Sequence, residues 1–386
     1  LKQYIFSLIV DGQIHKAIKE LKNNETNENV DFFEAYLLLA LENIKKGNFL
    51  KGQKYLNKLL KFTENNTFEL IIYESLSDFL YLFENKKIRY KKNNLGNLTL
   101  INRAFQGCYI NNNNTETYFI NLINNSQVDH TRYIFFYVVY LIDQGKFKKA
   151  QEITNQIEPL NSNLLILQAK DWIDNNKFKN FTKVFSCKNE KDILSEFIFL
   201  IGNIYSNQKN FEKSNFYLNL SNYLNPDFIF NSSLLAENHY NNKNYKQSER
   251  IINKFNKNNE TYYWYRLKKK AHILSKEVSE EESFNFINLK FQKINNPSIK
   301  MIFDMANIAK AFKKYEIAIK YYDLIISQSE FDLNIYADLL YRRGASYERV
   351  GKYNKSDNDF LKSLKINPDD AYVLNYLAYS WLERGY

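Results

Sequence analysis

The chain has little of the material that turns or cross-links a backbone. Its 386 residues include 10 Gly, 4 Pro and 2 Cys. So few glycines and prolines leave little for β-hairpins or long loops, which favours helices joined by short turns. The two cysteines, Cys108 and Cys187, form no CxxC motif and lie far apart in the sequence. They are compatible with a reducing cytosol and with a cysteine-poor cell envelope alike.

Long hydrophobic runs are missing as well. The longest apolar stretch, residues 133–142, is too short to cross a bilayer and predicts a buried helix. No transmembrane segment is therefore expected. The chain begins at Leu1 without methionine and ends at Tyr386 inside a helical pattern. We expect both ends to be trimmed, and a signal peptide or lipid anchor before Leu1 is compatible with this sequence.

Signatures of catalysis and of metal binding are also absent from the sequence. It contains no GxSxG, Walker or dinucleotide-binding motif. The histidines, none of which has a neighbour at metal-ligand spacing, are His15, His130, His239 and His272. His239 occupies a packing slot of the repeat and is expected in a core or a groove. The sequence predicts a protein that is not an enzyme and has no metal site and no cofactor.

What the sequence does contain is a repeating frame of about 34 residues. Most of its glycines fall on two slots of this frame. One slot is a short polar turn between two amphipathic stretches, occupied by Gly12, Gly47, Gly145, Gly351 and Gly385. The other slot, where two helices must approach closely, holds Gly202 and Gly344. Because the frame accounts for these glycines, no phosphate-binding loop is expected.

The frame is clearest in residues 195–227 and 339–370. The shared residues are Ile198, Gly202, Tyr205, Ser214, Leu218, Ser221 and Pro226 in the first copy, and Leu340, Gly344, Tyr347, Ser356, Phe360, Ser363 and Pro368 in the second. A small residue on one helix admits a bulky side chain of the other, and neither helix can bury its apolar stripe alone. Poorer copies lie around Tyr36, Ile134, Leu165, Ala236 and Ala306, and a last one begins at Ala371.

This order of residues resembles the tetratricopeptide repeat. The resemblance implies an all-α fold, a right-handed α-solenoid of stacked helical hairpins, which we expect to form a single domain over residues 1–386. The frame lapses twice. Residues 67–130 are interpreted as a divergent segment with enlarged turns, and residues 261–294 as a degenerate repeat that lacks the small residues. The last repeat, residues 371–386, is incomplete.

Residues 339–385 also show a narrower resemblance, to the tetratricopeptide proteins of the alphaproteobacterial cell envelope. The likeness is carried by Arg343, Gly344, Glu348, Arg349, Asp357, Asp359, Pro368 and residues 373–381, where Ala378 replaces the usual glycine. It implies a non-enzymatic bacterial scaffold, often exported to the periplasm or envelope. Some relatives are adaptors for a processing protease. The expected function is binding of a protein or peptide partner, in envelope protein assembly or proteolysis; the partner, the compartment and the oligomeric state stay open.

The net charge of +10 raises an alternative, an RNA-binding helical-repeat protein. RNA binding would need basic residues along the concave face, which tetratricopeptide proteins build from fixed slots of each first helix. These slots hold Lys45, Arg132, Lys170, Lys300, Lys310 and Arg349, together with Glu34, Asp143, Asp174, Glu196, Glu237, Asp338, Glu348 and Glu383. Acidic residues outnumber basic ones there, so nucleic acid is the less favoured partner. The excess lysine is assigned to second helices and loops, notably residues 86–92.

Aromatic and amide residues of the same slots are the candidate peptide-binding site. The fifth slot of the first helix holds Phe135, Phe199, Phe303 and Tyr341, and the ninth holds Asn203 and Asn307. Rings supply buried area and amides pair with a peptide backbone, so these residues suit an extended or helical peptide. The alternative is that the rings pack onto the helices of the next unit.

Overall fold

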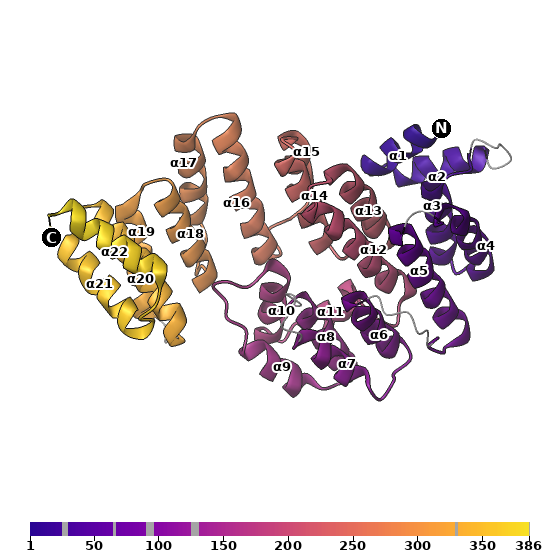
Figure 1. Cartoon of the computed structure of the whole chain (residues 1–386), viewed down its shortest axis with the longest axis horizontal. Helices are drawn as coiled ribbons and strands as arrows, with labels where there is room; N and C mark the ends of the chain where they lie inside the picture. The colour runs from indigo at the N-terminus through magenta and orange to yellow at the C-terminus, as the bar shows by residue number, and fades with distance from the viewer. Residues whose placement is uncertain (25–29, 65–66, 90–95, 125–130, 329–330, 386) are drawn as a thin grey trace. The chain divides into compact units, whose positions relative to one another are not determined.

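The computed structural model describes residues 1–24, 30–64, 67–89, 96–124, 131–328 and 331–385. This part of the chain folds into helices and turns without a β-strand, which confirms the all-α prediction (Figure 1). His130, Tyr386 and residues 90–92 of the lysine-rich stretch lie outside it. None of the described helices combines the length and the hydropathy needed to cross a bilayer.

The chain divides into two compact units. Unit 1 comprises Leu1–Ile157 and Ser162–Asn256, and unit 2 comprises Glu158–Asn161 and Lys257–Tyr386. Each unit has a hydrophobic core of its own. A single solenoid domain over residues 1–386 stays a prediction.

Unit 1 is a series of helices of very different lengths. They are α1 (Lys2–Val10), α2 (Ile14–Asn23), α3 (Phe33–Lys45), α4 (Phe49–Leu59), the 3-10 turn η2 (Leu60–Phe62), α5 (Thr67–Asn85), α6 (Asn97–Tyr109), α7 (Thr115–Ile123), α8 (Arg132–Asp143), α9 (Phe147–Asn155), α10 (Leu164–Asp174), α11 (Lys179–Val184), α12 (Glu190–Asn207), α13 (Phe211–Leu224), α14 (Phe230–Asn241) and α15 (Tyr245–Ile252). The described part of the divergent segment 67–130 thus contains the helices α5, α6 and α7.

Unit 2 is built from helical hairpins that follow one another along the chain. Its helices are α16 (Glu260–Glu277), α17 (Glu280–Phe291), α18 (Ile299–Ala311), α19 (Tyr315–Gln328), α20 (Leu333–Arg349), α21 (Tyr353–Ile366) and α22 (Ala371–Glu383). Consecutive helices pack against each other from α16 to α22. Segment 158–161 adds Leu160, which is buried among residues of α16 to α20.

Many hairpins turn at a residue with a positive φ angle just before the second helix. Gly145 and Gly351 have φ values of 70° and 74° there. Glycine adopts this left-handed conformation without steric cost. The same turn slot is occupied by lysine at Lys209, Lys243 and Lys313, with φ values of 59°, 60° and 58°. The glycines therefore mark only part of the frame that the backbone follows.

Small residues hold the two helices of a hairpin together. Ser214 on α13 donates a hydrogen bond of 2.7 Å to the carbonyl oxygen of Gly202 on α12. A Cβ atom on Gly202 would lie 3.0 Å from Leu218. Residues 261–294 contain the same arrangement, since Ser283 donates to the carbonyl of Ala271 at 2.6 Å. That repeat was expected to lack small residues; it keeps them in the two helix-contact slots.

The N-terminal helices of unit 1 pack onto the repeat formed by α12 and α13 (Figure 1). Phe6 of α1 stacks on Phe216 of α13, with ring centroids 5.1 Å apart. Asn219 of α13 donates 2.7 Å to the backbone carbonyl of Val10, where α1 ends. The start of the chain therefore covers helices about 200 residues further on.

A disulfide bond links two segments of unit 1 that are far apart in the sequence. It joins Cys108 of α6 to Cys187 in the segment before α12, with their Cα atoms 5.8 Å apart, within the usual range. Both cysteines are buried. Lys188 reinforces the junction by donating 2.6 Å to the carbonyl of Cys108. The divergent segment is thus linked covalently to the segment that leads into α12, beyond the helices α8 to α11.

Candidate partner-binding site

The phenylalanines predicted to anchor a peptide are buried in this structure. Phe135, Phe199 and Phe303 are 0%, 4% and 3% exposed. Phe135 packs against Phe181 and Phe228 at centroid distances of 5.8 and 5.6 Å. These rings thus support the helix stack, as the packing alternative expects, and their role as anchors would require them to become accessible.

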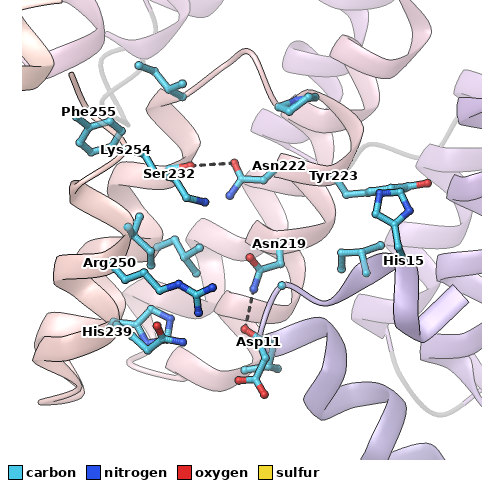
Figure 2. Close-up of a pocket in the computed structure, with 18 of the residues that line it drawn as sticks. Asp11, His15, Asn219, Asn222, Tyr223, Ser232, His239, Arg250, Lys254 and Phe255 are labelled. Atoms are coloured by element: carbon cyan, nitrogen blue, oxygen red, sulfur yellow. Dashed lines mark hydrogen bonds between the residues drawn. The ribbon is translucent and has the colours of Figure 1, made fainter. Parts of the chain in front are cut away.

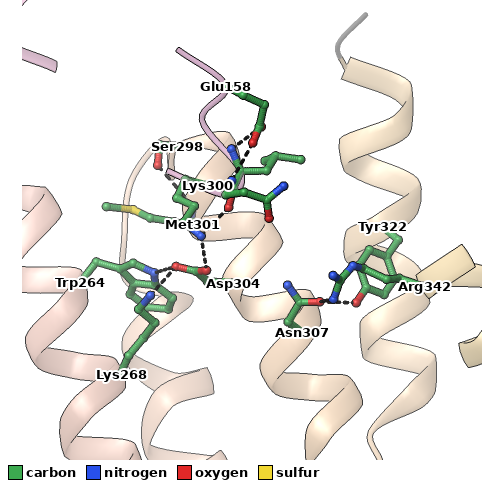
Figure 3. A network of polar contacts seen from close by, with 12 residues as sticks. Glu158, Trp264, Lys268, Ser298, Lys300, Met301, Asp304, Asn307, Tyr322 and Arg342 are labelled. Carbon is green, nitrogen blue, oxygen red and sulfur yellow. Dashed lines mark hydrogen bonds and ion pairs between the residues drawn. The ribbon is translucent and has the colours of Figure 1, made fainter. Parts of the chain in front are cut away.

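Tyr341 and the two predicted amides are less deeply placed. Tyr341 is partly exposed and lies edge-on to Tyr376, with centroids 6.1 Å apart. Asn307 accepts hydrogen bonds from the Tyr322 hydroxyl at 2.7 Å and from Arg342 at 3.1 Å (Figure 3). Asn203 is half-buried, and within the described part of the chain its side chain has no hydrogen-bond partner. Of the two amides, Asn203 is thus the one whose oxygen and nitrogen both lack a partner among the described residues.

Two charges in the predicted first-helix slots of unit 1 neutralise each other in a buried ion pair. Arg132 of α8 forms a two-point ion pair with Glu196 of α12, at 2.9 and 2.5 Å. Burial raises the pKa of Glu196, and the Arg132 guanidinium opposes that rise. The guanidinium also lies 3.9 Å from the centroid of the Phe199 ring. This cluster holds helices together and has no charge left for a phosphate or carboxylate.

A second buried charge cluster organises unit 2 around Asp304 of α18 (Figure 3). Trp264 Nε1 and Lys268 Nζ donate to its carboxylate at 2.9 and 2.6 Å, and Lys300 donates at 2.9 Å. Lys300 also donates 2.6 Å to the backbone carbonyl of Leu160. Burial opposes ionisation of Asp304, but the two lysines outweigh it, so its pKa is lowered. The cluster joins α16, α18 and segment 158–161.

A pocket of about 480 Å³ opens in unit 1 (Figure 2). It will be called the unit 1 pocket. The α1–α2 turn forms one side, and α13, α14 and α15 form the others. Its polar lining includes Asp11, His15, Lys45, Asn219, Asn222, His239, Gln247, Arg250 and Lys254. The sequence slots account for only Lys45 and His239 of this polar lining, because the other residues come from turns and second helices.

The pattern of the family is found in both units. Residues 195–228 and 337–370 match the model of the tetratricopeptide repeat. The chain therefore contains two tetratricopeptide repeats, one in each unit. The two matched segments are the hairpins α12–α13 and α20–α21, the two copies in which the sequence frame is clearest. No curated protein sequence matches the chain.

Several solved structures resemble the chain weakly. The crystal structure of the APC/C hetero-tetramer Cut9-Hcn1 is similar at 12% identity over 99% of this chain and 89% of that one, with a TM-score of 0.37. Yeast Tom70 has 12% identity over 98% and 87%, with a TM-score of 0.38. Human IFIT1, a dimer with PPP-AAAA, has 13% identity over 95% and 89%, with a TM-score of 0.29. Scores of this size give no information about function.

His239, which the sequence places in a packing slot of the repeat, lines the unit 1 pocket together with His15. It lies half-buried on α14, as expected for a core or groove histidine. Burial lowers its pKa, and the nearby Asp11 carboxylate opposes that shift. No group of three or more His, Cys, Asp and Glu side chains that could hold a metal ion is found among the described residues.

Proposed function

We propose that this tetratricopeptide chain is a non-enzymatic scaffold that binds a protein or peptide segment, and that the unit 1 pocket is its primary contact. One observation carries the proposal: the phenylalanines in the predicted slots are buried and Arg132 is paired with Glu196, whereas the pocket has polar groups without partners among the described residues. Arg250 and Lys254 line it, and neither forms an ion pair within the described part of the chain. Pockets in this size range usually take a small ligand or a short segment.

RNA binding is the alternative that the net charge suggests, and it has less support. The slot residues Arg132 and Glu196 pair with each other. Sequence-tolerant RNA binding also needs aromatic faces on which bases can stack. Phe135, Phe199 and Phe303 are buried and offer no such faces. Protein is therefore the proposed partner.

A role in an oxidising compartment, such as a bacterial envelope, is the narrower proposal. The disulfide between Cys108 and Cys187 supports it, because such bonds persist mainly in exported proteins. Envelope protein assembly or proteolysis is the matching activity. The test is to alkylate free thiols in cells of the native host before lysis: an exported chain should resist modification, and full alkylation without reductant would contradict the proposal.

The scaffold function itself is tested by site-specific crosslinking in the native host. A photoreactive residue replaces Ser232, which lines the pocket, and a control carries it at Leu50 of α4, which is 80% exposed and outside the pocket. We expect protein adducts at the first position and few at the second. Recovery of RNA adducts alone, or of no adduct at all, would contradict a protein-binding scaffold.

A further inference from the structure

We propose that the unit 1 pocket binds the carboxylate side chains of a short acidic peptide segment. The inference rests on the proposed scaffold function and specifies the chemistry of its partner. The pocket is assembled from the α1–α2 turn and from α13 to α15, which are about 200 residues apart in the chain (Figure 2). No single repeat contains all the walls of the pocket, so the pocket depends on the packing of the N-terminal helices onto this later part of the chain.

The walls of the pocket are fixed by contacts within the protein. Asn219 donates 2.7 Å to the carbonyl of Val10 and so holds the α1–α2 turn in place. The Tyr223 hydroxyl donates to the Glu42 carboxylate. Lys45 donates to the backbone carbonyl of Tyr223 and lies 3.7 Å from the centroid of its ring. A pocket shaped before binding loses less entropy when a ligand enters.

The charge of the lining favours an anion. Lys45, Arg250 and Lys254 are basic, whereas Asp11 is the carboxylate in the lining. Asp11 lies at the α1–α2 turn, where its charge acts on His239. Arg250 of α15 and Lys254 of the turn after it are exposed and form no ion pair with any described residue (Figure 2). Ligand carboxylates placed there would gain charge-assisted hydrogen bonds, which are the strong ones.

The neutral part of the lining suits a peptide. Asn222 accepts a hydrogen bond of 3.5 Å from the Ser232 hydroxyl, and its amide nitrogen donates to no described residue. That nitrogen is available to a peptide carbonyl. Ile229 and Leu235 add apolar surface beside it. An acidic segment that also carries an apolar side chain matches both kinds of wall.

Nucleic acid matches the pocket less well, although it too is anionic. Bases bind by stacking on exposed aromatic faces. One aromatic ring of the lining, Phe255, is 1% exposed. The other, Tyr223, is covered by Lys45 and faces the edge of His15 with centroids 5.4 Å apart. The pocket thus offers cations without stacking surfaces.

The test measures binding to the full chain by fluorescence anisotropy. The probe is a labelled peptide of alternating glutamate and leucine at physiological ionic strength. The double variant Arg250→Glu/Lys254→Glu reverses the free charges, and we expect at least about tenfold weaker binding, since each charge-assisted hydrogen bond contributes on that order. The matched control, Lys243→Glu/Lys246→Glu, makes the same change of net charge on the α14–α15 hairpin outside the pocket. It should bind within about twofold of the parent chain, because exposed charges at a distance are screened by salt.

Each outcome decides the inference. Equal binding of a glutamine–leucine peptide would show that carboxylates are not recognised, and undetectable binding of the acidic peptide would overturn the inference. Oligouridylate that binds more tightly, with the same loss in the pocket variant, would assign the site to RNA. Circular dichroism melting of both variants checks that they are folded. If the pocket variant still crosslinks the cellular partner through residue 232, the scaffold function stands and the acidic-peptide inference falls.

Discussion

The Ser283 hydroxyl of α17 donates a hydrogen bond of 2.6 Å to the backbone carbonyl of Ala271 on α16. The same spacing recurs where Ser248 donates to Ala236 at 2.9 Å and where Ser214 donates to Gly202 at 2.7 Å. The serine slot of the repeat is thus both a space for the neighbouring helix and a hydrogen-bond donor to it. In the α20–α21 hairpin the corresponding Ser356 is buried, but its Oγ has no partner among the described residues.

This difference predicts opposite effects of one substitution in two hairpins. Ser283→Ala removes a buried hydrogen bond and should lower the free energy of unfolding by about 0.5–1.5 kcal/mol. Ser356→Ala removes a buried hydroxyl that is not hydrogen-bonded, so it should be neutral or stabilising. Urea denaturation of the two variants measures both effects. Equal destabilisation by both would show that Ser356 is hydrogen-bonded in solution.

Gly344 should not tolerate a side chain. A Cβ atom there would lie 3.0 Å from the Phe360 ring and 3.2 Å from Asp359. Gly344→Leu is expected to overpack the α20–α21 contact and to destabilise the protein by about 1–3 kcal/mol. Lys362→Leu, on the exposed side of α21, adds the same side chain and should stay within about 0.5 kcal/mol of the parent. Thermal melting compares the two variants. An unchanged melting curve for Gly344→Leu would contradict the assignment of Gly344 to a helix-contact slot of the repeat.

Asp304 should make unit 2 sensitive to acid. Its pKa is lowered in the folded state, so the ionised group stabilises the fold above the ordinary aspartate pKa of 3.8. That contribution is lost as the pH falls through the lower folded-state pKa. Asp304→Asn leaves Lys268 and Lys300 without their buried partner and should cost about 3 kcal/mol at neutral pH.

The measurement is urea unfolding as a function of pH. The variant should lose less stability than the parent chain on acidification. Asp323→Asn is the control, because its carboxylate is 48% exposed and its partner Arg343 keeps Asp359. That control should cost less than about 1 kcal/mol. Equal costs of the two substitutions would show that the Asp304 cluster is not a buried charge network.

The disulfide should stabilise unit 1. Cross-linking Cys108 to Cys187 restricts the unfolded chain, and loss of such a bond typically costs about 2–4 kcal/mol. Cys108→Ser/Cys187→Ser should therefore melt at a lower temperature than the oxidised parent. Dithiothreitol should lower the parent's melting temperature to that of the variant and leave the variant unchanged. A parent that melts identically with and without reductant would contradict the bond's stabilising role.

Phe199 should contribute to the stability of the fold and not directly to partner binding. Its ring is 4% exposed and lies under the Arg132 guanidinium. Phe199→Ala leaves a cavity and should cost about 3–5 kcal/mol. Tyr341→Ala, at a partly exposed ring in the same slot of the frame, should cost less. A folded and stable Phe199→Ala chain with weakened partner capture would restore Phe199 as a binding anchor.

The local features of this fold follow from the sequence, because they depend on residues close together in the chain. Gly202 and Gly344 were assigned to helix contacts, and both meet a facing side chain at 3.0 Å. The turn slot was assigned to glycine, and it holds lysine at Lys209 and Lys243 in other hairpins. Helix length and turn position are local properties, so a period and a few small residues are enough to predict them.

The candidate site depended on contacts that no local pattern encodes. Slot numbering indicated the face on which Phe135 lies, but only the stacking of α8 against α10, α11 and the segment before α14 decided that this face is covered. The pairing of Cys108 with Cys187 depends on the path of a long loop. The unit 1 pocket exists because α1 packs onto α13, and a contact between segments that far apart leaves no periodic signal in either. The sequence alone thus determined helices, turns and packing slots, whereas the tertiary structure decided which surfaces are buried and where polar groups are left free.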